Sequence, residues 1–204
     1  MAGMFEEKRV PDRQIRAVQT ETTVRVYQAY SPAIADAALE KQTFVAPFKR
    51  DRMTWIKPSF RWMAYRCGYG RKPGQERILA IDITRDGFEW ALGHAALSKP
   101  RRDQDAAAWN QQLKTSPVRI QWDPERDLDH TALNFRAIQI GLSGEAVDHY
   151  VDEWITAITD VTPVMRDISG LLATDQLHLA VKLVPHEPPY ELPEDLARAI
   201  DATP

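Results

Sequence analysis

The segment TTVRVYQAYSP, residues 22–32, decides how the chain begins to fold. Val24 and Val26 fall on one face of an extended chain and alternate with residues on the other face, and β-branched and aromatic residues favour strands. The Ser31-Pro32 pair that follows is typical of a helix N-cap with proline in the first turn. We therefore predict a strand over residues 22–30 and then a helix to about Gln42.

The same patterns predict further short elements along the chain. Ser59 is a typical N-cap for a short helix, and Pro47 to Trp55 has the character of a loop. We predict strands over 78–83, 118–123 and 136–142, and helices over 60–67, 88–92, 106–113 and 143–158, with one or two more over 160–184. Strands dominate the middle and helices the C-terminal third. This order favours an α+β fold with a small mixed or antiparallel sheet and flanking helices.

The length and composition are those of a globular protein with one main domain. The chain has 204 residues, of which 44% are hydrophobic and 27% charged, so it does not resemble a disordered or fibrous protein. We predict a single α+β domain over residues 1–185. A proline-rich tail with a short helix is expected over residues 186–204.

The cysteine count and the apolar runs bear on the compartment. Cys67 is the single cysteine, so no intramolecular disulfide is possible and a reducing compartment is favoured. Residues 1–12 carry several charges and no apolar stretch, unlike a signal peptide, and no apolar run is long enough to cross a bilayer. We expect a cytoplasmic protein with no membrane partner. The sequence does not determine its oligomeric state.

The charges are distributed unevenly. Lys49 to Arg77 contains nine basic residues and only two acidic ones, whereas the C-terminal half is acidic and the whole chain has a net charge of −3. Such a block is typical either of a phosphate-binding surface or of a solvated face that pairs with acidic residues elsewhere. Charge alone favours the second interpretation, because the total is close to neutral.

The densest chemistry lies in RMTWIKPSFRWMAYR, residues 52–66. Here cations such as Arg52 and Lys57 alternate with flat aromatic rings such as Trp55. A site that holds phosphates and stacks a base needs this combination. The alternative is a core helix whose cationic stems lie over aromatic neighbours. A binding role is favoured more strongly for the loop residues than for those on the helix.

Other constellations are weaker. Acidic residues alternate from Asp123 to Asp129, but the spacing lacks the glycine of a calcium loop, which favours a solvated acidic loop over a metal site. The five histidines are scattered and form no zinc pattern with Cys67. We therefore expect no metal.

Several blocks of the chain resemble one protein family. They are VYQAY (26–30), DRMTWIKPSF (51–60), GQER (74–77), GFEWAL (87–92), RAIQIG (136–141) and WI (154–155). Together they are similar to the domain of unknown function 4291 family, over roughly residues 15–174. The family name carries no established activity.

A second resemblance, at the level of the fold alone, is to the ADP-ribosyltransferases. That fold places a polar residue on an early strand, a hydroxyl residue at an element start and an acid on a late strand. Gln28 or Tyr27, then Ser59, then Asp123 or Glu125 follow this order. The usual histidine or arginine is absent from the first position. The resemblance implies NAD as cofactor, with a carboxylate that bonds a ribose hydroxyl in the transition state.

Two functions remain open at this point. The first is a nucleotide- or NAD-using transferase; the second is a non-catalytic module that binds RNA or a nucleotide. The expected catalytic residues are Gln28, Ser59, Asp123 and Glu125, and the expected cofactor-binding residues are Tyr27, Arg52, Trp55, Lys57, Tyr65 and Arg66. We expect Arg52, Trp55, Lys57 and Ser59 to line one pocket with Gln28 or Tyr27. Glu125 should face the same side as Asp123 if the strand continues past Pro124. An acid that converges on the basic block would favour the enzyme.

Overall fold

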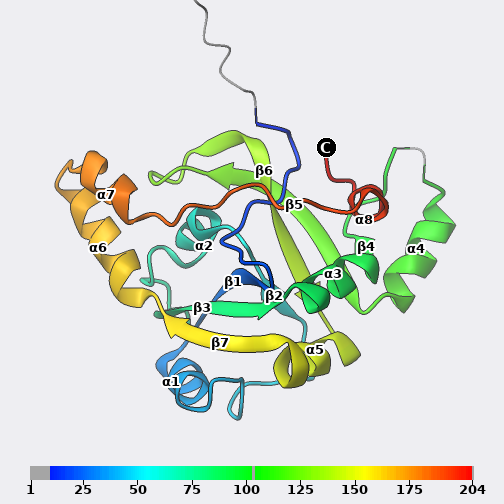
Figure 1. Cartoon of the computed structure of the whole chain (residues 1–204), viewed down its shortest axis with the longest axis horizontal. Coiled ribbons are helices and arrows are strands. Elements are labelled where there is room, and N and C mark those ends of the chain that lie inside the picture. Colours follow the sequence, from blue (N-terminus) through cyan, green and yellow to red (C-terminus); the bar gives the residue numbers. More distant parts are fainter. Residues whose placement is uncertain (1–9, 103, 204) are drawn as a thin grey trace, which may run out of the picture.

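Two small β-sheets form the centre of the molecule (Figure 1). The computed structural model describes residues 10–102 and 104–203. The first sheet is antiparallel and has the strand order β1 (Thr23–Tyr30), β3 (Arg77–Thr84), β7 (Ile155–Asp160). The strand predicted over residues 22–30 is therefore confirmed.

The second sheet is mixed. Its strand order is β2 (Thr54–Ile56), β6 (Ala132–Leu142), β5 (Val118–Arg126), β4 (Ala95–Leu97). The β4–β5 pair is parallel, whereas the other two pairs are antiparallel. Together with the flanking helices, these sheets confirm the predicted α+β class. The expected loop at 47–55 ends two residues early, at Met53, since Thr54 already pairs with Leu142.

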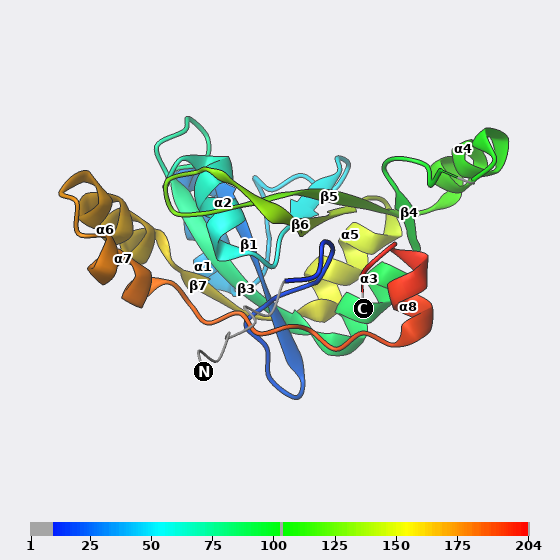
Figure 2. The ribbon, with the colours of Figure 1, turned by 90° about the horizontal axis from the view of Figure 1, so that it is seen from above.

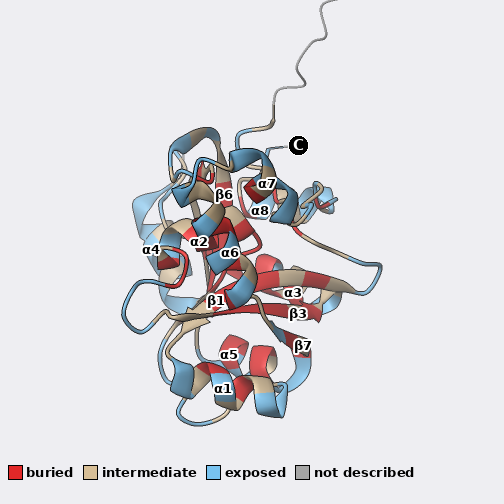
Figure 3. Cartoon of the chain, turned by 90° about the vertical axis from the view of Figure 1, so that its left-hand side faces the viewer, coloured by how far each residue is buried: buried red, intermediate tan, exposed pale blue. Residues whose placement is uncertain are grey.

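Helices cover both sides of the first sheet. The helical elements of the described residues are α1 (Pro32–Lys41), α2 (Phe60–Cys67), α3 (Arg85–Gly93), α4 (Ala106–Thr115), α5 (Glu145–His149), the π-helical turn η1 (Tyr150–Trp154), α6 (Thr162–Ala173), α7 (Leu177–Leu183) and α8 (Glu194–Ala199). Helices α1 and α5 lie on one side of this sheet, and α2 and α6 on the other (Figure 3). The α6–α7 pair and α4 stand at opposite ends of the molecule (Figure 2).

The alternation along β1 divides the core in two. Val24 and Val26 belong to one buried cluster with α1, α3 and the second sheet, whereas Tyr27 belongs to another with α2 and α6. The ring of Tyr27 meets Phe60 edge-on at 5.5 Å between centroids. Both faces of the strand are therefore buried, which fixes its register.

The helix predicted over 143–158 is wrong in its second half. The helical stretch ends at Trp154, after a π-helical turn, and Ile155–Asp160 is strand β7. Ile158 pairs with Ile81 in the sheet and is buried there. Apolar residues that are three positions apart fit a helix, but in this segment sheet pairing with β3 determines the structure.

One backbone contact connects the two sheets. The Tyr27 amide on β1 donates to the Lys57 carbonyl at 2.8 Å, just beyond β2. Residues 54–57 therefore pair with the second sheet through β2 and with the first sheet through Lys57. The segment with the densest cations and aromatic rings is thus held between the sheets.

The C-terminal segment follows the surface of the domain and inserts two side chains. Tyr190 donates its amide to the Ile15 carbonyl at 2.8 Å, and both Tyr190 and Ile200 are buried in the first cluster. Over the described residues, no helix has the length and apolar character needed to cross a membrane.

Gly87 allows a close contact between α3 and the π-helical turn η1, and this contact generates a prediction. A Cβ at this position would lie 2.3 Å from Cγ of Trp154, a buried and rigid neighbour. Gly87→Ala should therefore lower the free energy of unfolding by about 1–3 kcal/mol, as for overpacked cores. Urea unfolding followed by circular dichroism measures the change.

The matched control is Gly170→Ala on α6, where a Cβ meets nothing within 4 Å. Because alanine is the better helix former, this variant should gain about 0.5–1 kcal/mol. Equal effects of the two substitutions would contradict the close contact at Gly87.

Candidate functional site

Two adjoining cavities open on either side of the segment between the sheets. The first has a volume of about 470 Å³ and lies between the end of β1, the loop before β2 and the turn at Gly74. The second, of about 410 Å³, lies between α2 and strands β5 and β6. They share the side chains of Trp55, Lys57 and Arg66. Each is large enough for a nucleoside-sized ligand.

Trp55 forms the partition because its partner in the sheet is a glycine. Trp55 pairs with Gly141 on β6, and a Cβ on Gly141 would lie 3.0 Å from the Trp55 ring and 2.8 Å from Sδ of Met53. The missing side chain thus leaves room for the indole to lie across the neighbouring strand. This arrangement presents one aromatic ring to both cavities.

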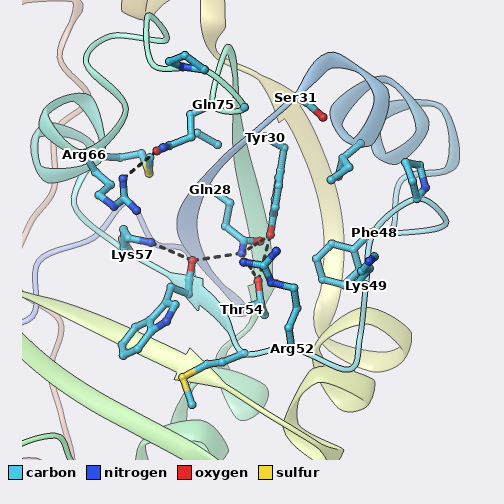
Figure 4. Close-up of a pocket in the computed structure, with 18 residues that line it drawn as sticks. Gln28, Tyr30, Ser31, Phe48, Lys49, Arg52, Thr54, Lys57, Arg66 and Gln75 are labelled. Carbon is cyan, nitrogen blue, oxygen red and sulfur yellow. Dashed lines mark hydrogen bonds between the residues drawn. The ribbon is translucent and has the colours of Figure 1, made fainter.

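Gln28 is buried beneath the first cavity, where its amide is fully engaged (Figure 4). Its Nε2 donates to Thr54 Oγ1 at 2.7 Å and lies 2.9 Å from the Tyr30 hydroxyl and 3.2 Å from the Trp55 carbonyl. Its Oε1 accepts from the Tyr150 hydroxyl at 2.7 Å. Every polar atom of this side chain is satisfied by the protein, so Gln28 positions the floor of the cavity.

Lys57 lies in the wall between the cavities with only 6% of its surface exposed. Its Nζ donates to the Trp55 carbonyl at 3.0 Å and lies 5.7 Å from the centre of the Trp62 ring. Burial and the nearby Arg66 guanidinium lower the pKa of Lys57 to about 7, although Asp123 favours the charged form. This lysine therefore exchanges a proton near neutral pH.

Cations and aromatic rings surround the first cavity. Arg52 places its guanidinium beside the Tyr30 and Thr54 hydroxyls, and Lys49 and Phe48 stand across from it (Figure 4). Arg66 donates to Gln75 Oε1 at 3.2 Å from the opposite rim. The predicted location of Arg52, Trp55 and Lys57 is confirmed, because all three line one cavity together with Gln28.

A carboxylate lines the second cavity. Asp123 lies there with Lys57, Arg66 and Arg126. Gln121 donates to both of its oxygens, at 2.9 and 3.0 Å, and Gln139 donates to Oδ2. These amides orient the carboxylate while leaving its charge in place. Asp123 therefore converges on the basic segment.

An aromatic platform lies beside this carboxylate. The Arg126 guanidinium stacks over the Tyr65 ring at 4.1 Å, and both line the second cavity. Trp62 lines it too, and its buried indole N–H has no acceptor among the described residues. A buried donor without a partner is costly in the free protein.

Ser59 was expected in the same pocket, and that prediction is wrong. Its hydroxyl accepts from the Trp62 amide at 3.0 Å and so caps α2. Ser59 and Glu125 instead line a narrow crevice on the other side of β5. An N-cap hydroxyl must point back at its own helix, so it cannot also face the cavity beyond.

Glu125 does not share the orientation of Asp123. The strand continues past Pro124, but the β5–β6 register shifts between Pro124 and Arg126, and this irregularity turns Glu125 inward and Arg126 outward. Burial raises the pKa of the Glu125 carboxyl, whereas a hydrogen bond from Ser59 opposes that shift. The expected alternation is therefore wrong at this residue.

Tyr27 also lies away from both cavities, because its ring is packed in the second core cluster. The residues that sequence reasoning missed are Lys49, Trp62, Gln121, Arg126 and Gln139. The sequence did contain a signal for Gln121, because Gln121 and Asp123 are two residues apart on the predicted strand and so share one face. Gln139 depended on the β5–β6 register, which pairs it with Gln121.

The acidic hairpin between β5 and β6 forms a turn. Oδ1 of Asp127 accepts the amides of Asp129 and Thr131, at 3.0 and 2.8 Å. Within residues 10–102 and 104–203, no group of three histidine, cysteine or acidic side chains is placed to hold a metal ion.

A second acid, Glu187, lies against the first residue of α2 and near Glu125, and it generates a prediction. Oε1 of Glu187 accepts the Phe60 amide at 2.8 Å, and burial raises the pKa of Glu187 from 4.5 to about 8. Between these values the folded protein keeps a proton that the unfolded chain has released, so stability falls as the pH rises from about 5 to 8. Glu187→Gln, which keeps the acceptor without the charge, should flatten this fall by on the order of 1 kcal/mol.

Thermal or urea unfolding at pH 5, 6, 7 and 8 measures the profile. Glu191→Gln makes the same charge change on an exposed position of the same segment and should leave the slope unchanged. A Glu187→Gln profile parallel to that of the unmodified protein would contradict a buried, protonated Glu187.

Comparison with known proteins identifies a family for this chain, but the description of that family names no activity. Comparison with curated proteins gives no match. One family model, described as a domain of unknown function (DUF4291), matches residues 14–190 and so spans both sheets and both cavities. The chain belongs to the DUF4291 family.

Proposed function

We propose that this protein is a transferase that uses a nucleotide of the NAD type and cleaves its bond to nicotinamide. The observation that carries the proposal is the position of Asp123, whose carboxylate lines one cavity together with Lys57, Arg66 and Arg126. A surface that only binds phosphates gains nothing from an anion at its centre, because the anion repels the ligand. A carboxylate does help a reaction whose transition state becomes cationic.

The cations around the cavities fit a phosphate ligand. Arg50 and Arg77, which lie outside them, pair with the acids Asp152 and Asp160. Lys49, Arg52 and Arg66 line the first cavity and make no ion pair within the described residues. Cations left without acidic partners at a cavity are suited to bind a pyrophosphate.

The shape of the site fits a dinucleotide. Two nucleoside-sized cavities meet at Trp55, Lys57 and Arg66, so a pyrophosphate at this junction would place one nucleoside in each cavity. Trp55 and Tyr65 offer faces for stacking, and the Trp62 indole N–H offers a donor to a ligand acceptor.

In this mechanism Asp123 accepts a hydrogen bond from a ribose hydroxyl. As the bond to nicotinamide breaks, positive charge develops on the ribose, and the carboxylate stabilises it more than it stabilises the ground state. The Gln121 and Gln139 amides hold the carboxylate in place.

The lone Cys67 is compatible with a reducing compartment, and we propose the cytoplasm as the location of this activity.

The first test follows nicotinamide release from NAD⁺. Asp123→Asn keeps the size of the side chain and removes its charge, so turnover should fall roughly a hundredfold or more while NAD⁺ affinity changes only a few-fold. Chromatography of released nicotinamide gives turnover, and calorimetry gives affinity. Glu125→Gln, on the far side of β5, should retain turnover.

Other outcomes separate the alternatives. Binding of NAD⁺ or RNA without any release by the unmodified protein, with and without protein or RNA acceptors, would favour the non-catalytic binding module. Loss of turnover in Glu125→Gln but not in Asp123→Asn would exchange the roles of the two acids.

The second test concerns the phosphate contacts. Arg52→Glu replaces an exposed loop cation beside the first cavity, so ADP affinity should fall roughly tenfold or more while the melting temperature stays within about 2 °C. Arg71→Glu makes the same charge change on an exposed residue outside both cavities and is the matched control. Equal loss of affinity in both variants would indicate a general effect of net charge and contradict a specific contact.

A further inference from the structure

Lys57 is an unusual lysine. Its side chain is almost completely buried, and its Nζ has one protein acceptor, the Trp55 carbonyl at 3.0 Å. Within the described residues it makes no ion pair. A buried ammonium without a carboxylate partner is costly, so the environment favours the neutral amine.

The groups that face Lys57 act in opposite directions. Arg66 on α2 disfavours the ammonium, whereas Asp123 on β5 and Cys67 on α2 favour it, and burial is the dominant cause of the pKa of about 7. A substantial share of the Lys57 side chains is therefore neutral near pH 7, against fewer than about one in a thousand for an ordinary lysine with a pKa of 10.5.

A neutral amine is poorly suited to bind phosphate but well suited to act as a nucleophile. Lys49 and Arg52 provide exposed cations at the first cavity. Lys57 instead stands where the two cavities meet, beside the cavity wall that carries the Asp123 carboxylate. Amine and carboxylate thus border the same space from different elements.

We propose that Lys57 is the nucleophile of the reaction and becomes covalently linked to the ribose of its dinucleotide substrate. The proposal rests on the proposed function. Nζ forms a bond to the anomeric carbon, the bond from that carbon to the pyridinium nitrogen breaks, and its electron pair leaves with neutral nicotinamide. The new ammonium releases a proton to Asp123 or to water. The resulting glycosylamine opens to an imine: the nitrogen lone pair forms the C=N bond, the bond from the anomeric carbon to the ring oxygen breaks, and the nitrogen proton passes to that oxygen to give a hydroxyl. Water, or the nucleophile of an acceptor, then adds to the imine carbon and releases the ADP-ribosyl group and the free amine.

The imine makes the linkage detectable. Sodium cyanoborohydride delivers a hydride to the protonated imine carbon and converts it to a stable secondary amine. The protein is incubated with NAD⁺ and this reductant, digested with trypsin and analysed by mass spectrometry. Residues 53–61 form one tryptic peptide in which Lys57 is the sole lysine, because the Lys57-Pro58 bond resists cleavage.

The expected result is an ADP-ribosyl adduct on this peptide, at least roughly tenfold above that on Lys49, which lines the first cavity but is exposed. Its yield should rise from pH 6 to 8 and then level, because the amine is neutral above its pKa of about 7. A parallel incubation with free ADP-ribose measures the background of non-enzymatic labelling. Lys57→Met should abolish both adduct and nicotinamide release, whereas Lys182→Met, at an exposed position of α7 outside both cavities, should keep both.

Three results would overturn the inference. Nicotinamide release with no adduct on peptide 53–61 would reject Lys57 as nucleophile and leave the proposed function standing. Full release by Lys57→Met would do the same. An adduct yield at Lys57 equal to that from free ADP-ribose would show background labelling only. Absence of release by the unmodified protein would instead reject the proposed function and this inference with it. The adduct is mapped in the unmodified protein, so the test does not depend on how Lys57→Met folds.

Discussion

The buried amide of Gln28 and the adjacent backbone bridge from Tyr27 to Lys57 hold the two sheets together. Gln28 bonds Thr54 and Trp55 on β2 and Tyr150 in the π-helical turn η1, while Tyr27 donates to the Lys57 carbonyl. The bonds of Gln28 to Thr54 and Tyr150 are buried, where an unmade hydrogen bond costs about 1–3 kcal/mol. Polar contacts that tolerate little displacement therefore fix the relative position of the two sheets. They also fix the positions of the residues from both sheets that line the two cavities.

The same contacts produce the chemistry of the site. Pairing of residues 54–56 with β6 and of Lys57 with β1 confines the Lys57 side chain to the wall between the two cavities, so its amine is largely desolvated by the fold. Had this lysine lain on the exposed loop with Arg52, it would be an ordinary surface cation. Its lowered pKa thus follows first from this burial and then from the nearby Arg66 guanidinium.

How well the sequence predicts each part of this structure depends on how far apart along the chain the interacting residues lie. Local signals were sufficient for β1 and for the Ser59 cap, since alternation and capping depend on near neighbours. The strand at Ile155–Asp160 escaped prediction because pairing with β3, distant in sequence, determines it. Asp123 and Glu125 have equivalent sequence surroundings, and only the register shift after Pro124 separates them. Gln139 reaches the site through pairing between strands, which no local pattern reveals.

The arrangement of charge explains why both interpretations of the basic segment hold, each for different residues. Arg50 and Arg77 form ion pairs with acids of the C-terminal half, as intramolecular compensation requires. The cations at the first cavity have no such partners in the described structure, and their mutual repulsion disfavours the empty site. An anion bound there relieves this repulsion, so binding stabilises the folded protein in proportion to its affinity. The unpaired cations therefore cost the free protein some stability, and the site they form favours a ligand that brings its own negative charge.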